Sequence, residues 1–226
     1  MKIGFFAQDE GEHLYIGRNL IRSVRENMPG TEVYQLTDEH TPVLDGAIPV
    51  RLKGDMPMAV RRMSHHAMLE GEWLFVDTDC VILKDVSDVF DDPAFDIAVT
   101  DRKGSMWEKT AYGMVMPYNM GVTFSRSPAF WAEVRLRLLE LPAAYQRWEG
   151  DQRVVCDMIR KGFPAKVLPG KVFNFTPHNR GDSLEHAAIA HFKGARKHWI
   201  SDLWKSDVSP CDSTNDSTDR PTRTLK

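Results

Sequence analysis

Cysteine, net charge and long apolar runs are all scarce in this 226-residue chain. The three cysteines, Cys80, Cys156 and Cys211, are scattered and odd in number, which argues against a disulfide framework and predicts a reducing, cytoplasmic compartment. None of them has the spacing of a zinc ligand. The net charge of −3 is too small to indicate nucleic acid or an acidic partner.

The apolar runs are all shorter than a membrane span, so no transmembrane segment is expected. The N-terminal stretch MKIGFFAQDEGEH turns acidic after a few apolar residues, which is typical of a first strand and not of a signal peptide. Residues 206–226 are dominated by polar and turn-forming side chains, which predicts a disordered C-terminal tail. Residues 1–205 are long enough for one domain with a substantial core.

Apolar patterning in residues 1–205 predicts strands that alternate with helices. The expected strands are 3–7, 31–37, 47–52, 73–83, 96–100, 119–125 and a short one at 165–170. The expected helices are 15–28, 58–70, a segment capped by Ser127 with Pro128 in its first turn, and 151–162. This alternation predicts an α/β domain whose sheet is mostly parallel, and irregular later connections favour a mixed sheet.

The segment GEWLFVDTDCVILKDVSDVF, residues 71–90, places two aspartates in the most strand-like part of the chain. Side chains two apart on a strand point to the same face, so Asp77 and Asp79 are expected to project together. Two adjacent carboxylates repel each other, and a divalent metal that also holds phosphate oxygens would relieve the repulsion. The simpler interpretation is a pair of solvated aspartates at the end of a strand.

The same aspartates also fit the nucleophile motif of haloacid-dehalogenase-type phosphatases, in which the first carboxylate attacks phosphate. That family needs a lysine between Ser125 and Asp151, and residues 126–150 contain none. The phosphatase would also leave about a third of the chain, upstream of its first motif, without a role.

A set of motifs in a fixed order points to a different enzyme class. The segment WLFVDTDCVILKDVSDVF resembles the D-x-D strand of GT-A-fold glycosyltransferases, in particular glycosyltransferase family 8, which includes glycogenin and bacterial lipopolysaccharide galactosyltransferases. Matching segments occur in the family's order over residues 1 to about 200: FFAQD, YNMGVTFS, GDQRVVCDMI, LPGKVFNF and HFKGARKHW. In the last motif, His198 stands where the family usually has proline.

The resemblance implies a single GT-A (Rossmann-like) domain over residues 1–205, with a mixed, mainly parallel central sheet flanked by helices. It also implies transfer of a hexose from a nucleoside diphosphate sugar, expected to be a UDP-sugar, to an acceptor hydroxyl, with retention at the anomeric carbon. The acceptor could be a glycan, a lipid-linked sugar or a protein. A catalytically silent protein that keeps the fold and binds a nucleotide sugar or glycan is the alternative.

The resemblance assigns the metal to Asp77, Asp79 and His191, with Asp77 also touching the ribose or the donor sugar. An imidazole beside carboxylates and diphosphate oxygens favours Mn²⁺, and Mg²⁺ is the alternative. Gly194 would let the backbone approach the diphosphate, and Lys197 would offset charge on the leaving group.

The remaining implied contacts lie around the donor. Arg61, or its neighbour Arg62, would contact the diphosphate or the sugar. The base and ribose would meet Ala7, Gln8, Asp9 and Tyr15, with Tyr15 stacking on the base. The donor sugar would be surrounded by Asp101, Asn119, Asp151 and Gln152.

The expected reaction is attack on the same face of the sugar as the leaving group, with Gln152 near the reacting carbon, because no carboxylate nucleophile emerges from the sequence. Asp151, Gln152 and Lys197 are the expected catalytic residues. Asp151 could instead simply cap the start of its helix.

Overall fold

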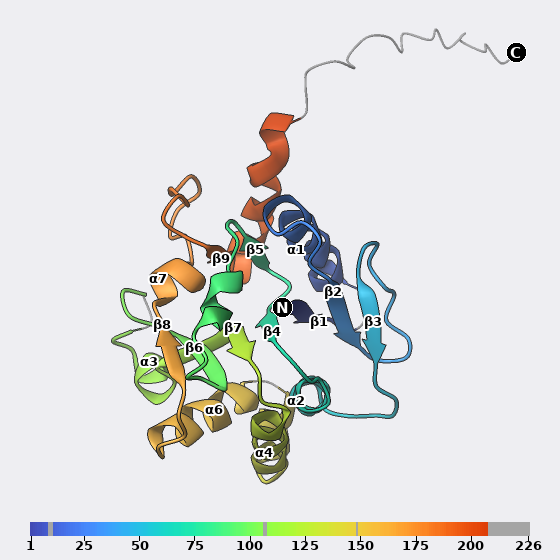
Figure 1. Ribbon diagram of the computed structural model, residues 1–226, viewed down its shortest axis with the longest axis vertical. Helices are drawn as coiled ribbons and strands as arrows, with labels where there is room; N and C mark the ends of the chain where they lie inside the picture. Colours follow the sequence, from blue (N-terminus) through green and yellow to red (C-terminus); the bar gives the residue numbers. More distant parts are fainter. Residues whose placement is uncertain (9–10, 106–107, 148, 208–226) are drawn as a thin grey trace, which may run out of the picture.

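The computed structural model describes residues 1–8, 11–105, 108–147 and 149–207 (Figure 1). The strands are β1 (Lys2–Phe6), β2 (Val33–Thr37), β3 (Ile48–Arg51), β4 (Trp73–Val76), β5 (Cys80–Ile82), β6 (Ile97–Asp101), β7 (Tyr118–Ser125), β8 (Lys166–Leu168) and β9 (Ile189–His191). The α-helices are α1 (Glu12–Asn27), α2 (Met58–Ala67), α3 (Ala111–Val115), α4 (Pro128–Leu139), α5 (Ala143–Arg147), α6 (Gly150–Arg160) and α7 (Gly170–Phe173), and the 3₁₀ segments are η1 (Ser87–Asp91) and η2 (Gly194–Asp207).

Seven strands form one central sheet in the order β3-β2-β1-β4-β7-β6-β8. Neighbours β3-β2, β2-β1, β1-β4 and β6-β8 are parallel, whereas β7 runs antiparallel to both β4 and β6. The prediction of a mixed, mainly parallel sheet is therefore confirmed. Strands β5 and β9 pair with each other in a separate two-stranded sheet.

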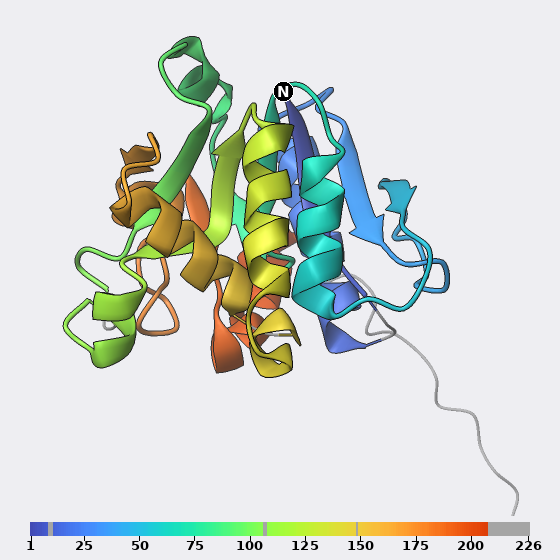
Figure 2. The same cartoon turned by 90° about the horizontal axis from the view of Figure 1, so that it is seen from below.

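Helices cover both faces of the central sheet (Figures 1 and 2). The side chains of β4 alternate between these two faces. Leu74 and Val76 belong to the core that packs against α1, while Trp73 and Phe75 belong to the core beneath α2, α4 and α6. This alternation follows from the two-residue period of a strand, and it explains why the segment is apolar at every position.

The expectation of one strand over residues 73–83 is wrong. Strand β4 ends at Val76, and the Cys80 N–H bonds to the Asp77 carbonyl at 3.1 Å, so that a turn separates β4 from β5. The chain then leaves the central sheet because β5 pairs with β9. Asp77 and Asp79 consequently lie on this turn, beyond the carboxyl end of β4, and their closeness does not come from strand alternation.

Helix α4 begins as its sequence predicts. The Ser127 side chain accepts a hydrogen bond from the Phe130 N–H at 3.2 Å, and Pro128 occupies the first turn. The short elements α3, α5, α7 and β9 were not predicted, because three to five residues are too few to establish a period.

No helix among the described residues is long and apolar enough to cross a membrane. The predicted tail, residues 206–226, lies almost entirely outside the described residues, so the domain boundary at 205 stays a prediction.

Two buried histidines join α2 to the sheet. The His65 ring bonds through Nε2 to the Thr37 carbonyl at 3.0 Å, and the His66 ring stacks on Phe75 with ring centroids 3.7 Å apart. Burial lowers the pKa of His65 to about 4, and it also lowers the pKa of His66 well below its ordinary value. Both rings are therefore neutral in the folded protein at neutral pH.

We expect the free energy of unfolding to fall as the pH drops from about 6.5 towards 4, by up to roughly 1.4 kcal/mol per pH unit for each buried ring. The sign follows because the unfolded chain takes up protons on these rings that the folded chain does not bind. Urea unfolding at several pH values in this range gives the free energy of unfolding against pH. This free energy should fall less steeply with decreasing pH in His65→Gln than in the wild type, whereas the exposed His40→Gln should match the wild type. Equal slopes for His65→Gln and the wild type would contradict this explanation.

Candidate functional site

The turn after β4 brings two predicted carboxylates to His191, which ends β9. His191 Nε2 lies 3.0 Å from Asp79 Oδ1 and 3.5 Å from Asp77 Oδ2, and Lys197 Nζ lies 3.4 Å from Asp79 Oδ2. Asp79 and His191 are 6% and 3% exposed, whereas the Asp77 side chain is partly open to solvent. All four side chains were predicted to share one site, and the structure brings them together.

A chain of buried amides orients the imidazole. Because an amide oxygen can only accept, the His191 Nδ1–H donates to Asn174 Oδ1 at 2.9 Å. The Asn174 amide nitrogen in turn donates to Asn119 Oδ1 at 2.8 Å and to Thr100 Oγ1 at 2.7 Å. Asn119 Oδ1 also accepts from the Gly121 N–H at 2.8 Å. The network directs His191 Nε2 towards Asp77 and Asp79.

This orientation leaves the His191 Nε2 lone pair facing carboxylate oxygens. Such an arrangement is repulsive unless a proton or a cation lies between the imidazole and the carboxylates. Burial alone would raise the pKa of Asp79, but when that proton is present, the protonated His191 ring and the Lys197 ammonium group outweigh burial and lower it. A metal-ligating histidine usually donates its other ring N–H to a protein oxygen, as His191 does to Asn174, so these residues fit a divalent metal.

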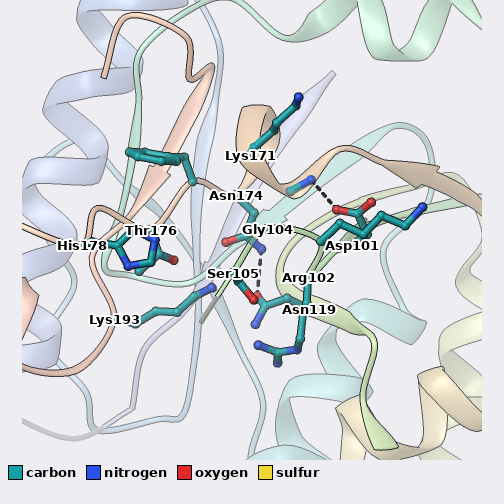
Figure 3. A pocket seen from close by; sticks show the side chains of 13 residues that line it. Asp101, Arg102, Gly104, Ser105, Asn119, Lys171, Asn174, Thr176, His178 and Lys193 are labelled. Carbon is teal, nitrogen blue, oxygen red and sulfur yellow. Dashed lines mark hydrogen bonds between the residues drawn. The ribbon is translucent and has the colours of Figure 1, made fainter. Parts of the chain in front are cut away.

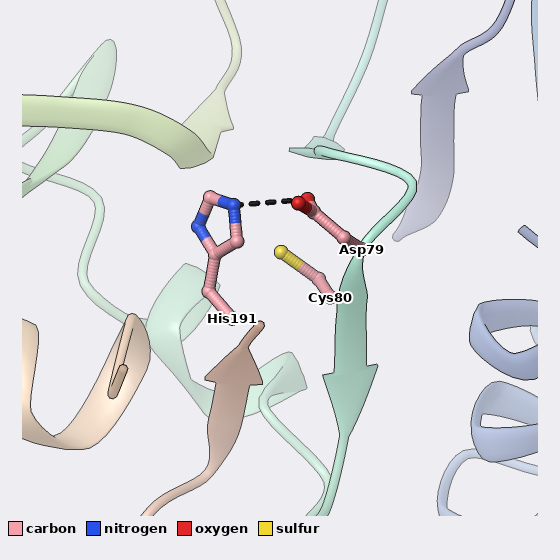
Figure 4. A group of neighbouring side chains, drawn as sticks. All are labelled: Asp79, Cys80 and His191. Atoms are coloured by element: carbon pink, nitrogen blue, oxygen red, sulfur yellow. Dashed lines mark ion pairs between the residues drawn. The ribbon is translucent and has the colours of Figure 1, made fainter. Parts of the chain in front are cut away.

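The Cys80 thiol lies beside the same pair. Ligand atoms of Asp79, Cys80 and His191 all fall within 4.8 Å of one another (Figure 4). However, the thiol approaches the Gly121 carbonyl at 3.4 Å, and burial together with Asp79 and Asp77 raises the Cys80 pKa well above its ordinary value. The thiol therefore already has a partner in the Gly121 carbonyl, and Asp77 Oδ2, 3.5 Å from His191 Nε2, offers a second carboxylate oxygen to the imidazole.

Gly121 is the residue that lets His191 approach the carboxylates. A Cβ atom at this position would lie 2.2 Å from His191 Cε1 and 2.8 Å from Asp77 Oδ2. The G-V segment of β7 therefore has a steric reason for its glycine, which the sequence motif alone did not disclose.

An arginine on α2 connects Asp77 to α6, but it is Arg62 and not the preferred Arg61. The Arg62 guanidinium donates to Asp151 Oδ2 through Nε at 2.8 Å and again through Nη2, and its Nη1 lies 3.4 Å from Asp77 Oδ1. The Arg61 guanidinium instead donates to the carbonyls of Leu52 and Gly54 at 2.8 and 2.7 Å. Helix register explains the difference, because adjacent residues on a helix project about 100° apart.

Asp151 and Gln152 open helix α6 at the edge of the site. Asp151 is fully buried, and its Oδ1 accepts from the Gln152 N–H at 2.8 Å. Gln152 Oε1 accepts from the Met120 N–H at 3.2 Å, while its amide nitrogen lies 3.4 Å from the Tyr112 hydroxyl. Asp151 thus holds Arg62 and the start of α6 in place.

The residues predicted to bind the base follow β1. The Ala7 N–H donates to the Leu36 carbonyl at 3.0 Å, and Gln8 Oε1 is buried without a partner among the described residues. Tyr15 is 54% exposed on α1, with the Arg18 guanidinium 5.0 Å from its ring centroid. Asp9 lies outside the described residues.

Gly194 begins the η2 segment that carries Lys197. Its φ of +62° lies in the left-handed region that favours glycine. A Cβ at Gly194 would meet no atom within 4 Å, so the backbone there is uncovered by other described groups and open to a ligand.

Asp101 and Asn119 line an open pocket that adjoins the amide network (Figure 3). Asp101 Oδ1 accepts from the Gly170 N–H at 2.8 Å. Lys193 also lines the pocket, and burial, with Arg102 nearby, lowers the pKa of its ammonium group to about 8.

Comparison with known proteins gives structural matches only. No protein-family model and no curated protein matches the sequence. The galactosyltransferase LgtC, in complex with donor and acceptor sugar analogues, superposes with a TM-score of 0.62 at 13% identity, over 92% of this chain and 100% of that chain. A glycosyltransferase involved in glycosylation of the major capsid of PBCV-1 superposes with a TM-score of 0.60 at 15% identity, over 90% of this chain and 99% of that one.

A third match is the apo-form glycosyltransferase GlyE of Streptococcus pneumoniae TIGR4, with a TM-score of 0.61 at 15% identity, over 91% of this chain and 63% of that chain. These matches confirm the predicted GT-A fold and the resemblance to glycosyltransferase family 8, to which LgtC belongs. At such identities the likeness establishes the fold.

Sequence reasoning missed four residues that build this site: Asn174, Gly121, Lys193 and Arg102. Asn174 lies in LPGKVFNF and Gly121 in YNMGVTFS, both of which were matched to the family without a role for these residues. For Asn174, the available signal was that amide side chains recur at the ends of separate segments, as Asn119 and Asn174 do. Lys193 carried no signal, because a lysine between two motif residues is indistinguishable from a surface lysine.

We expect Gly121→Ala to lower the free energy of unfolding by about 1–3 kcal/mol, because the added methyl group collides with the His191 ring. Urea unfolding of the two single variants and of Gly121→Ala combined with His191→Ala forms a double-mutant cycle. The alanine at 121 should cost less when residue 191 is also alanine. Additive costs would show that the His191 ring is not what Gly121 accommodates.

Proposed function

We propose that this protein is a retaining glycosyltransferase that moves a hexose from a UDP-sugar to an acceptor hydroxyl and depends on a divalent metal, with Mn²⁺ favoured over Mg²⁺. The observation that carries the proposal is the His191 ring, held through Nδ1 by Asn174 with Nε2 aimed at Asp77 and Asp79. The GT-A fold, which the matched glycosyltransferases share, supports the same activity.

Asp77, Asp79 and His191 would hold the metal. When bound, the metal would neutralise the donor diphosphate and act as a Lewis acid on the leaving group. Asp77 is the most exposed of the three and therefore the one best placed to touch the donor as well.

The donor diphosphate would lie against η2. Lys197 lies 3.4 Å from Asp79 and would turn towards the phosphate oxygens when the donor binds. The backbone at Gly194 is uncovered, so its N–H could approach the same phosphate oxygens. The base would lie beyond β1, where the unpartnered Gln8 Oε1 can accept a hydrogen bond and Tyr15 has an exposed ring to stack on. Arg62 takes the donor role first assigned to Arg61, since its guanidinium reaches Asp77.

In the reaction, the bond from the anomeric carbon to the phosphate oxygen breaks and a bond to the acceptor oxygen forms on the same face. The acceptor proton goes to the leaving phosphate oxygen. Asp151 is fully buried and paired with Arg62, which argues against its acting as a covalent nucleophile. Its part would be to position Arg62 and Gln152, with Gln152, Asp101 and Asn119 near the donor sugar.

Two alternatives receive less support. A binding-only protein would have no evident need for Lys197 beside the three ligands. The phosphatase hypothesis is disfavoured because the fold matches that of glycosyltransferases. A cytoplasmic location stays a prediction from cysteine content.

The first test is nucleoside diphosphate release from a panel of UDP- and GDP-sugars, with Mn²⁺, Mg²⁺ or chelator. We expect release from a UDP-sugar that needs Mn²⁺ and falls about 100-fold or more in Asp79→Ala. Asp91→Ala, which removes an exposed carboxylate in η1, is the matched control and should behave as the wild type. Metal-dependent donor binding in calorimetry without any release, even with a broad acceptor mixture, would favour the binding-only protein.

A second test concerns Gln152. Gln152→Ala should lower the turnover number about ten-fold or more, while the donor dissociation constant changes little, because the amide acts on the reacting sugar. A solved active-site glutamine-to-glutamate mutant of LgtC shows that this side-chain type occupies that enzyme's active site. If Gln152→Ala loses donor affinity in proportion to its loss of turnover, Gln152 binds the donor and does not act at the reacting carbon.

A further inference from the structure

Most of the charged residues that line the pocket beside the amide network are basic. The lining includes the side chains of Arg102, Lys103, Lys171 and Lys193, against the single carboxylate of Asp101. The Asp101 carboxylate is already used by the Gly170 N–H at 2.8 Å. The pocket thus has an excess of positive charge that its own acidic residue does not neutralise.

Lys193 is the cation best placed to meet a ligand. Its side chain points into the pocket from the residue pair that follows β9 (Figure 3). Within the described ranges, 1–8, 11–105, 108–147 and 149–207, its ammonium group makes no ion pair or hydrogen bond. The Asp77 and Asp79 carboxylates act on this charge from beyond ion-pair distance, so an incoming anion in the pocket would stabilise the ammonium group further.

Arg102 and Ser105 reinforce this charge. Arg102 is buried, its Nε donates to the Met116 carbonyl at 2.8 Å, and its guanidinium lies 5.1 Å from the Tyr112 ring centroid, so the cation is held in place. Ser105 Oγ is buried and has no partner among the described residues. A fixed cation, a free ammonium group and a free hydroxyl are the groups that recognise a carboxylate or phosphate.

The position of the pocket assigns this charge to the acceptor and not to the donor diphosphate. Asn119 and Asn174 line the pocket, and Asn174 bonds on its other side to His191. Lys197 lies on Asp79 at the metal ligands and supplies the cation that a diphosphate needs there. Asp101 and Asn119, which we propose lie near the donor sugar, also line the pocket, so the pocket borders the donor sugar on the side where the attacking hydroxyl has to arrive.

We propose that the acceptor is an acidic saccharide, whose carboxylate or phosphate group binds the Lys193 ammonium group and the Ser105 hydroxyl in this pocket. This inference rests on the proposed function, since it names the substrate class of the same site. The transfer itself is unchanged, because the acidic group orients the acceptor and takes no part in bond exchange.

The test compares matched pairs of sugars by ligand-observed NMR with UDP and the diamagnetic Mg²⁺ present: galacturonate with galactose, and glucose 6-phosphate with glucose. The wild type should bind the acidic member of at least one pair about ten-fold more tightly than the neutral one. Lys193→Gln should remove most of that preference, and Lys193→Arg should keep it. Lys161→Gln, which changes the exposed lysine at the C-cap of α6, is the charge-matched control and should bind like the wild type.

The four sugars also serve as acceptors in the nucleoside diphosphate release assay. A preference for galacturonate alone identifies a carboxylate, and one for glucose 6-phosphate alone identifies a phosphate. Equal binding of acidic and neutral sugars, or a preference that survives in Lys193→Gln, would overturn the inference while leaving donor hydrolysis as evidence for the enzyme. If acidic sugars bind in a Lys193-dependent way but no nucleoside diphosphate is released from any donor, the result would support the anion site and count against the proposed function.

Discussion

The site depends on one hydrogen bond, from His191 Nδ1 to Asn174 Oδ1. It fixes the protonated nitrogen on the side away from the carboxylates, and it leaves Nε2 aimed at Asp79 and Asp77. Because both His191 and Asn174 are buried, neither can turn to water as a substitute partner. The Lys197 ammonium group already faces Asp79 from one side, and a proton or a metal ion between Nε2 and the carboxylates would relieve the remaining repulsion, which is why we regard the cluster as suited to a cation.

The second constraint is the ion pair of Arg62 with Asp151. A fully buried carboxylate is costly without a partner, so the pair ties α2 to the start of α6. Arg62 also reaches Asp77, and Asp151 bonds the Gln152 N–H. One guanidinium group thus connects the two proposed halves of the site, the metal ligands and the sugar-binding residues. The amide network from Asn174 to Asn119 connects the same two halves from the other side.

Much of this arrangement was predictable from the sequence, and the failures have physical causes. The helices α1 and α2 were found because their apolar residues repeat at helical spacing, and α4 was found from Ser127 and Pro128 at its start. The turn at Asp77 was missed because apolar residues continue on both sides of it, and only the pairing of β5 with β9 shows that the chain leaves the sheet. The choice between Arg61 and Arg62 as the donor contact was left open because helix register cannot be read to one residue from the sequence, and the structure shows that Arg62 is the one that reaches Asp77. Asn174 and Lys193 needed three-dimensional contacts, which no spacing encodes.

The central claim is that a divalent cation binds between the D-x-D turn and His191. The most direct measurement is an anomalous difference map from a crystal grown with Mn²⁺ and UDP. Our account predicts a peak bonded to Asp79 and His191 Nε2, with His191 Nδ1 still within hydrogen-bond distance of Asn174. A map without a peak at this position, or with the manganese bound away from His191, would contradict it.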